Sequence, residues 1–554
     1  MKSSSLTLIS DFNLEPLKRF LSNSPALKET TIEVAPFGQV FQSLAQISPS
    51  DNSLFFVWTA PEKTLPGFSS AYNMESFTLE DCLKDVEHFA DAIIKSSSNK
   101  TVFVATWTIS PGKAGYGMLD WRPGTGLRHL LAQMNLCLAE RLAVHPNIFL
   151  LDSERWLHAA TPAESPKMWY TSKVPFSPKI FERVAEDLAS SMAAIQGVSR
   201  RLIVLDLDNT LWGNVIGETG WEGICLGGHD HVGEAYKDFQ LELKALSNQG
   251  VQLAIVSKND EAVALEALEK HPEMILRKND FIGWRINWQD KALNIASLLD
   301  EVRLGSGSVV FIDDNAAERD RVANAFPEIL TPEWPTDPTA YVTALRKLNC
   351  FNSAALSKED RERKSMYVAE RARREAENVM GSSDEWLARL NTRLKVERIN
   401  KANSARVAQL FNKTNQLNLS TRRLPEKEIV DWALQPGRSL LTISASDHFG
   451  DMGLVGIIAV ESSENKGYLT DFILSCRVMG RQVEETLIHL AANELSTFGA
   501  KQMKAMYRPT PRNRPTLDVL KNCGFTEHEQ HQFEIDISQG LPKPPSVTLV
   551  FNSD

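Results

Sequence analysis

The segment from Arg201 to Gly213, RLIVLDLDNTLWG, constrains the fold of this chain more than any other. Its first half is an apolar run that predicts a buried strand, and this strand runs directly into Asp206, Asp208 and Thr210. Alternation places both carboxylates on one side of the chain, at the carboxyl end of the strand. Ligands bind at that edge of open parallel sheets, and two acids so close repel each other unless a cation or proton intervenes. Magnesium fits, because it binds a few carboxylates together with water and phosphate oxygens.

Two later strands are predicted to end in polar residues that complete such a centre. The strand over 251–256 leads into a hydroxyl, a lysine and an amide, and the strand over 308–313 leads into two carboxylates. These residues are Ser257, Lys258 and Asn259, and then Asp313 and Asp314. Lys291 lies between the two strands in sequence and can neutralise an acidic centre. Taken singly, an Asp-x-Asp pair caps a loop or helix and a lysine lies on a surface; the order of the whole set favours a catalytic centre. A carboxylate nucleophile splits phosphoryl transfer into two steps, while a metal and a lysine stabilise the developing charge.

Strand and helix patterns alternate along most of the chain, which predicts an α/β fold with parallel sheets covered by helices. We expect four parts: 1–197, 198–350, a charged helical linker over 351–395, and 396–554. In the first part the expected strands are 31–36, 53–60, 101–108 and 147–152, and the expected helices are 79–96, 126–144 and 177–196. In the last part the expected strands are 439–445, 453–461, 467–474, 503–507 and 532–537, with a helix over 482–498.

The composition excludes several classes of protein. Of 554 residues, 60 are Lys or Arg and 70 are Asp or Glu, so the net charge is −10 and a general nucleic-acid binder is not expected. The charged segment over 355–395 has nearly balanced acids and bases and predicts a solvated helix rather than a nucleic-acid site. No apolar run approaches the ~20 residues of a membrane span, and the N-terminus lacks a signal-peptide pattern, so we expect a cytoplasmic chain. No Cys-x-x-Cys pair occurs among the six cysteines, so a structural zinc site is not expected and the thiols are predicted to be free.

The central segments resemble the four motifs of the haloacid dehalogenase (HAD) superfamily, which has a Rossmann-like core. The resemblance implies that Asp206 is a nucleophile that forms an aspartyl-phosphate and that Asp208 is the general acid and base. It implies further that Thr210 orients the first motif, that Ser257 with its neighbours Lys258 and Asn259 binds the phosphoryl group, and that Lys291 stabilises its charge. Asp313, helped by Asp314, would hold Mg²⁺ together with Asp206 and the main-chain carbonyl of Asp208.

The longer text around these motifs resembles the FkbH-type branch of that superfamily. The segments LDLDNTLWGNVIGETG, VSKNDE, HPEM, INWQDKALNIA and FIDDNAAERD carry the resemblance in the centre, and NKTNQLNLSTRR, DHFGDMGLVG and CRVMGRQVE carry it near the C-terminus. The C-terminal part is similar to GNAT acyltransferases, and the first 195 residues resemble a module related to SGNH hydrolases. FkbH-type proteins are associated with loading a glyceryl unit from 1,3-bisphosphoglycerate as a thioester on an acyl carrier protein for polyketide-type pathways. The resemblance therefore implies a phosphorylated three-carbon substrate, loss of phosphate, and acyl transfer to a phosphopantetheine thiol.

The chain departs from many glyceryl-loading members at the cysteine near the first motif. Leu207 and Ile216 stand at the positions where such a cysteine is found. Another residue must then carry the acyl group, or the group is transferred directly. Cys476 is the preferred alternative, with a core residue at a strand end as the competing interpretation. Cys225 is a second alternative, with a small buried thiol as the competing interpretation.

The two flanking parts offer weaker signals. Arg477, Gly480 and Arg481 precede the helix over 482–498, and free amides at a helix N-terminus attract the phosphates of a phosphopantetheine group. GNAT proteins have Gly or Ala where Gln482 stands, which argues against free coenzyme A and leaves a carrier-bound arm.

The N-terminal part has no Gly-Asp-Ser motif, and its one Asp-x-x-His lies inside a predicted helix at Asp85, so we expect docking or gating rather than an esterase. Trp121, Arg122 and Arg128 are candidates to meet an acidic partner.

Three functions remain open from the sequence. The first is an Mg²⁺-dependent glyceryl transferase and phosphatase of the FkbH type. The second is a small-molecule phosphatase with a non-catalytic C-terminal module, favoured by the missing cysteine and by Gln482. The third is a carrier-binding scaffold without catalysis, against which the intact set of Asp206, Asp208, Lys291 and Asp313 argues.

Overall fold

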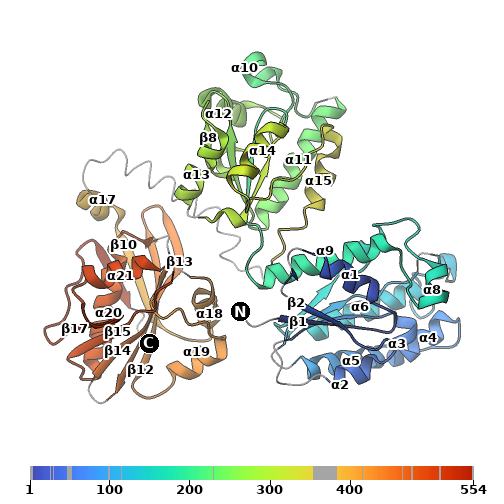
Figure 1. Cartoon of the computed structure of the whole chain (residues 1–554), viewed down its shortest axis with the longest axis horizontal. Coiled ribbons are helices and arrows are strands. Elements are labelled where there is room, and N and C mark those ends of the chain that lie inside the picture. Colours follow the sequence, from blue (N-terminus) through green and yellow to red (C-terminus); the bar gives the residue numbers. More distant parts are fainter. Residues whose placement is uncertain are drawn as a thin grey trace. The chain divides into compact units, whose positions relative to one another are not determined.

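The computed structural model describes residues 4–24, 27–28, 30–46, 53–97, 100–110, 112–113, 115–228, 230–302, 304–353, 383–414, 416–463, 466–475, 478–510 and 513–551. By its internal contacts the chain divides into two compact units, Met1–Ser199 with Asn352–Ala354, and Arg200–Phe351 with Ala355–Asp554. Three sheets form within these units, one before residue 200, one between 200 and 351, and one after 390 (Figure 1). The predicted α/β class, with several modules, is confirmed.

The first sheet is entirely parallel, with the strand order β2-β1-β3-β4-β5. Its strands are β1 (Ser4–Ser10), β2 (Thr30–Val34), β3 (Ser53–Trp58), β4 (Val102–Ala105) and β5 (Ile148–Leu151). The helices α5 (Leu79–Ser96) and α6 (Leu127–Ala143) bury one face, and α1 (Glu15–Ser22) and α9 (Pro178–Ile195) bury the other. The shorter helices are α2 (Val40–Ala45), α3 (Pro61–Thr64), α4 (Pro66–Tyr72), α7 (Glu154–Leu157) and α8 (Pro166–Ser172).

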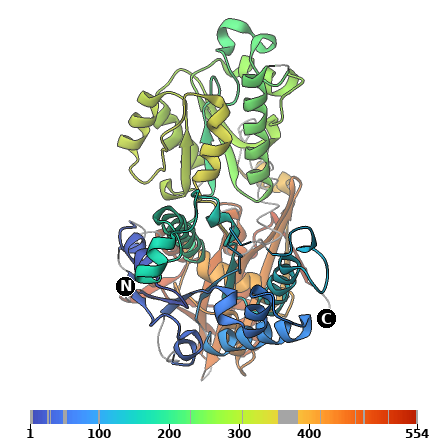
Figure 2. The same cartoon turned by 90° about the vertical axis from the view of Figure 1, so that its right-hand side faces the viewer.

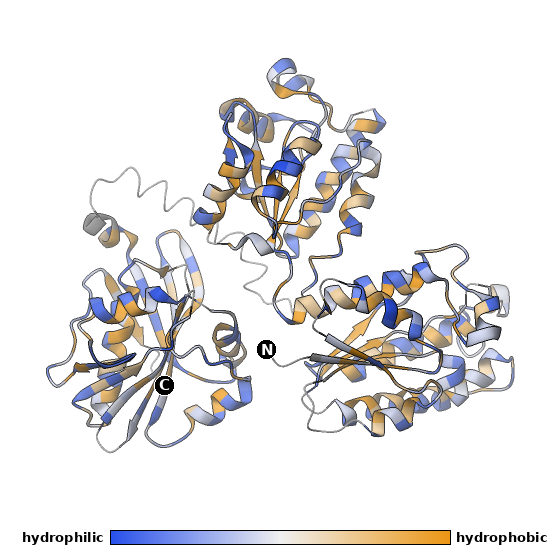
Figure 3. Cartoon of the chain, viewed as in Figure 1, coloured by the Kyte–Doolittle hydropathy of each residue, from blue (hydrophilic) through white to orange (hydrophobic). Residues whose placement is uncertain are grey.

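The second sheet is also parallel, with the order β8-β7-β6-β9. Its strands are β6 (Leu202–Leu205), β7 (Gln252–Ser257), β8 (Phe281–Ile286) and β9 (Val309–Ile312). Helices α11 (His231–Asn248), α12 (Glu261–Lys270) and α15 (Tyr341–Lys347) cover one face. Helices α13 (Lys291–Val302) and α14 (Ala316–Ala325) cover the other, as Figure 2 shows from the side. The two strands that carry the carboxylates, β6 and β9, are apolar and buried throughout because both faces of the sheet are covered (Figure 3).

The third sheet is mixed and follows the order β16-β17-β15-β14-β13-β12-β10-β18, with β11 paired to β14. Its strands are β10 (Thr392–Arg398), β11 (Leu417–Asn418), β12 (Arg438–Asp447), β13 (Gly450–Ser463), β14 (Lys466–Leu474), β15 (Gln502–Met506), β16 (Thr526–Glu529), β17 (Gln532–Asp536) and β18 (Val547–Phe551). Helices α20 (Val483–Thr497) and α21 (Arg514–Asn522) cover one face, and α18 (Ser404–Lys413) and α19 (Glu426–Ala433) cover the other.

The linker prediction needs correction at its C-terminal end. Residues 392–395, assigned to a charged helix, belong to strand β10, whose residues alternate between buried and exposed. The alternation of Leu394 and Val396 with charged residues is the strand signal that the charge content concealed. Before it lies α17 (Ser383–Leu390), and most of the predicted linker falls outside the described residues. The predicted domain boundaries stay predictions.

No helix in the described part of the chain combines the length and apolar character needed to span a membrane.

Candidate active site

The candidate site lies where the strand order of the second sheet reverses. Strands β7 and β8 lie on one side of β6, and β9 lies on the other, so the chain leaves the sheet in opposite directions at the carboxyl ends of β6 and β9. A crevice for ligands forms at such a switch point. Leu205 pairs with Ile312, and the backbone N–H of Asp206 donates to Ile312 O at 3.0 Å. Asp206 and Asp313 are therefore neighbours, one residue beyond the paired strands.

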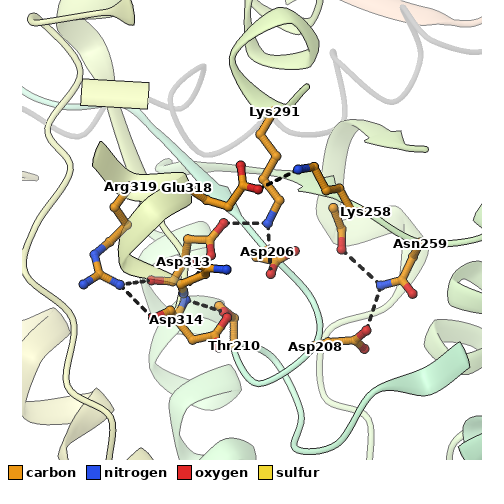
Figure 4. Close-up of polar contacts among 12 residues, drawn as sticks. Asp206, Asp208, Thr210, Lys258, Asn259, Lys291, Asp313, Asp314, Glu318 and Arg319 are labelled. Atoms are coloured by element: carbon orange, nitrogen blue, oxygen red, sulfur yellow. Dashed lines mark hydrogen bonds and ion pairs between the residues drawn. The ribbon is translucent and has the colours of Figure 1, made fainter. Parts of the chain in front are cut away.

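Three carboxylates meet at this point. Asp206, Asp313 and Asp314 each offer an oxygen, and the three oxygens lie within 4.8 Å of one another. Lys291, the first residue of α13, places its Nζ 2.6 Å from Asp313 Oδ2 and 3.1 Å from Asp206 Oδ2 (Figure 4). The structure thus brings together the predicted nucleophile, the predicted lysine and both acids of the last motif. One ammonium faces three carboxylates, so the cluster is short of positive charge.

Burial makes this shortage costly. Asp206, Lys291 and Asp313 are 7%, 3% and 0% exposed. Burial, followed by the negative charge of Asp206, raises the pKa of Asp313 to about 7 against the opposing effect of Lys291, and the same two causes raise the pKa of Asp314. Burial lowers the pKa of Lys291, but the charges of Asp206 and Asp313 outweigh it and hold that pKa above its ordinary value. Either a proton or a cation is needed to relieve the repulsion among these carboxylates.

The cluster fits a magnesium ion by its donor set. Asp206 Oδ1 is buried and accepts no hydrogen bond from the protein, which is costly for a carboxylate oxygen unless another ligand satisfies it. Hard carboxylate oxygens are the protein ligands that Mg²⁺ prefers. Asp206, Asp313 and Asp314 would hold the ion.

The carboxylate of Asp208 does not join this cluster. Its Oδ1 accepts hydrogen bonds from Trp212 Nε1 at 2.9 Å and from the backbone N–H of Ile216 at 3.1 Å. Its Oδ2 accepts from Asn259 Nδ2 at 3.1 Å. The carboxylate is therefore oriented by three donors and is not placed as a side-chain metal ligand. The predicted contribution of its main-chain carbonyl stays a prediction.

The remaining predicted residues of this centre surround it at the strand ends. Thr210 is fully buried, and its Oγ1 accepts from the backbone N–H of Asp314 at 3.3 Å, which ties the first motif to the last. Asn259 Nδ2 also donates to Ser257 Oγ at 3.2 Å, so one amide links the end of β7 to Asp208. Lys258 Nζ forms an ion pair with Glu318 Oε1 at 2.6 Å. The predicted contact of Lys258 with a phosphoryl group stays a prediction.

Two supporting residues were missed by the sequence reasoning. Glu318 and Arg319 lie on the first turn of α14, directly after the last motif. Arg319 Nη1 donates to the carbonyl oxygens of Asp313 and Asp314, at 2.8 Å each, and thereby fixes the turn that carries both carboxylates. The signal was present in the segment FIDDNAAERD, whose final charged residues face back toward the strand end.

The cysteines give no ready acyl carrier in the described part of this centre. Leu207 and Ile216, which replace the family cysteine, are both buried. Cys225 Sγ donates to Asp230 Oδ2 at 3.4 Å, and burial followed by this hydrogen bond raises the pKa of its thiol. A raised pKa lowers the thiolate fraction and therefore the nucleophilicity. Cys476 lies outside the described residues, so its predicted role stays a prediction.

The predicted pantetheine site has its groups engaged by the protein itself. Arg477 lies outside the described residues. The backbone N–H of Gly480 donates to Glu484 Oε1 at 2.7 Å, and Arg481 Nη1 lies 3.4 Å from Asp447 Oδ2. Glu484 is buried, burial raises its pKa, and its Oε2 accepts no hydrogen bond from the protein. An acidic side chain thus occupies the position before α20 at which an anion was expected.

Strand β11 is a second feature of the protein that argues against the predicted pantetheine site at α20. Strands β14 and β15 pair in parallel only from Gly467 to Leu469 on β14. Beyond that point β11 pairs with β14 instead, and Leu419 O accepts from the backbone N–H of Arg508 at 3.1 Å. The chain itself therefore lies between the two strands where they diverge.

Among the described residues of the N-terminal unit, the Asp-x-x-His is not arranged as a catalytic triad. Asp85 and His88 both lie within α5, as expected, and Asp85 Oδ2 accepts from the backbone N–H of Gly67 at 2.7 Å. That hydrogen bond gives Asp85 a structural role in holding the start of α4.

Comparison with known proteins gives one informative likeness. Neither a protein-family model nor a curated protein matches the chain. The chain is similar to the crystal structure of the N-terminal part of the protein BF1531 from Bacteroides fragilis, described as containing a phosphatase domain complexed with Mg. The likeness has 25% identity and a TM-score of 0.58, and it covers 63% of this chain and 94% of that one. It agrees with the α/β fold and with a phosphatase-type centre.

Smaller likenesses concern acetyltransferases. One is to the ribosomal-protein-S18-alanine N-acetyltransferase from Escherichia coli, with 9% identity and a TM-score of 0.21, over 26% of this chain and 94% of that one. Another is to the GNAT domain of PAT from S. lividans, with 15% identity and a TM-score of 0.21, over 26% of this chain and 89% of that one.

Proposed function

We propose that this chain is an Mg²⁺-dependent enzyme of the FkbH type, which takes a glyceryl unit from 1,3-bisphosphoglycerate, removes phosphate and loads the unit as a thioester on an acyl carrier protein. The observation that carries the phosphoryl-transfer half is the meeting of Asp206, Asp313 and Asp314 with Lys291 at the switch point of the second sheet. The likeness to a phosphatase domain complexed with Mg supports the same half. The resemblance of the sequence segments to FkbH-type proteins supports the acyl-carrier half.

In the first chemical step, a carboxylate oxygen of Asp206 attacks the phosphorus of the C3 phosphate. The new bond is between Asp206 and phosphorus, and the bond between phosphorus and the C3 oxygen breaks. Asp208 supplies the proton that this leaving oxygen takes up. Lys291, held between Asp206 and Asp313, stabilises the negative charge on the transferring group.

In the second step, water attacks the phosphorus of the aspartyl-phosphate and Asp208 accepts its proton. The bond between Asp206 and phosphorus breaks, inorganic phosphate leaves, and the carboxylate of Asp206 is restored. The donors from Trp212, Ile216 and Asn259 hold the carboxylate of Asp208 in a fixed orientation for this transfer. A bound Mg²⁺ would supply positive charge against which the phosphoryl oxygens are positioned.

The acyl-transfer step uses the other phosphate of the substrate. The thiolate of the carrier's phosphopantetheine attacks C1, a carbon–sulfur bond forms, and the bond between C1 and the phosphate oxygen breaks. The C1 phosphate leaves with the electron pair of that bond, so the step needs no further activation. Direct transfer suits a chain in which Leu207 and Ile216 replace the family cysteine.

A second candidate function is favoured by two observations in the C-terminal part. Glu484 already accepts the hydrogen bond of Gly480 N–H, and β11 lies beside the diverging end of β14. Such a C-terminal part would be non-catalytic, and the chain would then be a small-molecule phosphatase. A carrier-borne arm has one phosphodiester rather than the pyrophosphate of coenzyme A, so it depends less on this helix terminus than free coenzyme A does.

The deciding experiment measures the intact mass of a holo acyl carrier protein after incubation with the enzyme, Mg²⁺ and freshly generated 1,3-bisphosphoglycerate. We expect a gain in mass equal to a glyceryl group, absent with the Asp206→Asn variant. Asp300→Asn, an exposed carboxylate on the same helix as Lys291, is the matched control and should load normally.

A gain equal to a phosphoglyceryl group would place acyl transfer before dephosphorylation. Release of phosphate at a rate that no carrier changes, without any gain in carrier mass, would favour the small-molecule phosphatase instead.

A further inference from the structure

A loop of the N-terminal unit exposes four large apolar side chains to solvent. The loop joins the carboxyl end of β4 to α6, and its centre is a short 3-10 helix over Gly117–Leu119. The exposed side chains are Tyr116 (45%), Met118 (101%), Leu119 (39%) and Trp121 (66%). Isolated apolar residues are common on protein surfaces, but four within six residues of one loop concentrate exposed apolar surface in one place along the chain.

The loop is built to keep this shape. Asp120 Oδ1 accepts from the backbone N–H of Tyr116 at 2.7 Å, and Asp120 O accepts from the backbone N–H of His129 at 2.9 Å. Gly115 and Gly126 pack directly against Asp120, because a Cβ on either would lie 2.1 Å or 2.2 Å from an oxygen of that residue. The apolar side chains are therefore held outward by a closed turn instead of collapsing onto the sheet. A preorganised apolar surface loses little entropy on binding a partner.

The patch is bordered by positive charge. Arg122 and Arg128 follow it, and neither forms an ion pair with any residue that the structure describes. The one acid within the turn, Asp120, is occupied by the backbone of Tyr116. This local excess of arginine stands on a chain with a net charge of −10. Aromatic, methionine and arginine side chains together are the composition enriched in protein interfaces.

We propose that this apolar and basic patch, Tyr116, Met118, Leu119 and Trp121 with Arg122 and Arg128, is the docking surface for a small acidic protein. The inference rests on the proposed function in one respect: the acyl carrier protein is the partner with that chemistry. The apolar side chains contact an apolar strip of the carrier, and the arginines face its carboxylates.

A small protein fits the charge pattern better than a lipid bilayer does. Surface charges act over about 8 Å at physiological salt, so a small partner at the patch senses mainly the two arginines. An anionic bilayer extends past the patch and meets the rest of an acidic chain. Electrostatic steering by arginines also raises the association rate, and this effect weakens as salt is added.

The test measures binding of each acyl carrier protein encoded in the source genome, in its apo form without phosphopantetheine, to the full-length enzyme by titration calorimetry. Apo carriers are used because they report docking of the protein body and do not depend on acyl transfer. We expect at least one to bind, and we expect Trp121→Ala combined with Met118→Ser to weaken that binding at least about tenfold. Arg122→Glu should weaken binding of the carrier more at low salt than at high salt.

Tyr170→Ala is the matched control, because Tyr170 is also an exposed aromatic residue of the same unit but lies on α8, away from this loop in sequence. It should leave binding unchanged. All variants should release phosphate from a small phosphate ester at the wild-type rate, which shows that they are folded and separates docking from catalysis.

Carrier binding that the patch variants do not weaken would overturn the inference. Binding of no carrier would overturn it too, and binding of phosphatidylglycerol vesicles through the same residues would then identify a bilayer as the occupant. Failure of the proposed function is a different result: a carrier would bind through the patch, but its holo form would gain no glyceryl group.

Discussion

The two oxygens of Asp206 have unlike surroundings. Oδ2 lies 3.1 Å from Lys291 Nζ, while Oδ1 is buried without a hydrogen bond from the protein. A carboxylate in a purely structural ion pair would have both oxygens satisfied. Because Asp206 lies in one cluster with Asp313 and Asp314, this unsatisfied oxygen indicates a site for a ligand rather than a buried salt bridge.

Asp208 is expected to act on protons and not on the metal. Because its carboxylate is turned toward Trp212, Ile216 and Asn259, Asp208→Asn should lower the rate of phosphate release by about 10²–10⁴, the usual range for a general acid or base. Titration of the variant with Mg²⁺ should give an affinity close to that of the wild type. A large loss of Mg²⁺ affinity would instead assign the side chain to the metal.

Asp11, in the N-terminal unit, gives a pH-dependent contribution to stability. Its carboxylate accepts from the backbone N–H of Ala60 and from Thr64 Oγ1, but burial outweighs these bonds and raises its pKa from 3.8 to about 6. The folded state therefore binds this proton more tightly than the unfolded state. The stabilising contribution is fully present below the unfolded pKa and is lost as the pH rises through about 6.

The stability of the wild type relative to Asp11→Asn should accordingly fall between about pH 4 and about pH 7, since the variant carries no titrating group at this position. Thermal melting of both proteins across that range measures the difference. A difference in melting temperature that does not change with pH would contradict the assignment.

At the scale of helices and strands, the sequence predicted the elements whose periodicity is strong. The helices over 79–96, 126–144 and 177–196 correspond to α5, α6 and α9 within one residue at each end. The strands that end in site residues, β6, β7 and β9, were likewise predicted. These strands are recognised as short apolar runs that stop at polar residues. Such runs are typical of parallel strands because helices cover both faces of the sheet.

Other strands were missed for physical reasons that differ. In β1, Leu6 and Leu8 alternate with Ser and Thr, so the segment lacks a continuous apolar run although it lies in the interior of the first sheet, between β2 and β3. Strand β18, near the C-terminus, pairs in parallel with β10, and a local sequence pattern does not predict pairing with a strand so distant in sequence. Strand β11 has two residues, which is too short for any periodicity.

At the candidate site, the sequence predicted which residues lie together but not how their side chains are oriented. Spacing along the chain was enough to place Asp206, Lys291 and Asp313 together, because parallel strands end at one edge. Spacing does not determine a side-chain rotamer, so it could not foresee that the carboxylate of Asp208 faces Asn259 or that Lys258 pairs with Glu318. Nor could it foresee that Glu484 accepts the hydrogen bond of Gly480 N–H.

The start of α20 yields a prediction about ligand choice. With Glu484 against Gly480 N–H, free coenzyme A should bind the wild type poorly, because its pyrophosphate would meet a buried carboxyl group. Glu484→Ala frees the amide and removes the acid, and should strengthen binding of coenzyme A about tenfold or more. Glu494→Ala, later on the same helix, is the control. Equal affinity in wild type and Glu484→Ala, measured by calorimetry, would show that the helix terminus is not a phosphate site in either form.

For the molecule as a whole, the three sheets have separate cores, and the carboxylate cluster belongs to the second alone. Binding of a ligand to the folded state stabilises the part that holds it. A metal that binds at this cluster should therefore raise one melting transition and leave the others where they are.

Adding Mg²⁺ at about one hundred times its dissociation constant should stabilise the part that holds it by about 2.7 kcal/mol. Scanning calorimetry with Mg²⁺ and with a chelator measures this shift, and the chelator should also abolish phosphate release. In Asp313→Asn the shift should disappear. An upward shift that survives this substitution would place the metal elsewhere.

In the proposed mechanism, Asp206 carries the phosphoryl group during turnover. The most direct test is acid quenching of the enzyme within one turnover of a phosphate ester in the presence of Mg²⁺, followed by peptide mass spectrometry. We expect a phosphoryl-sized gain on the peptide that contains Asp206, absent from Asp206→Asn and longer-lived in Asp208→Asn. Turnover with no phosphoryl group on that peptide at any quench time, or with the group on another residue, would contradict this mechanism.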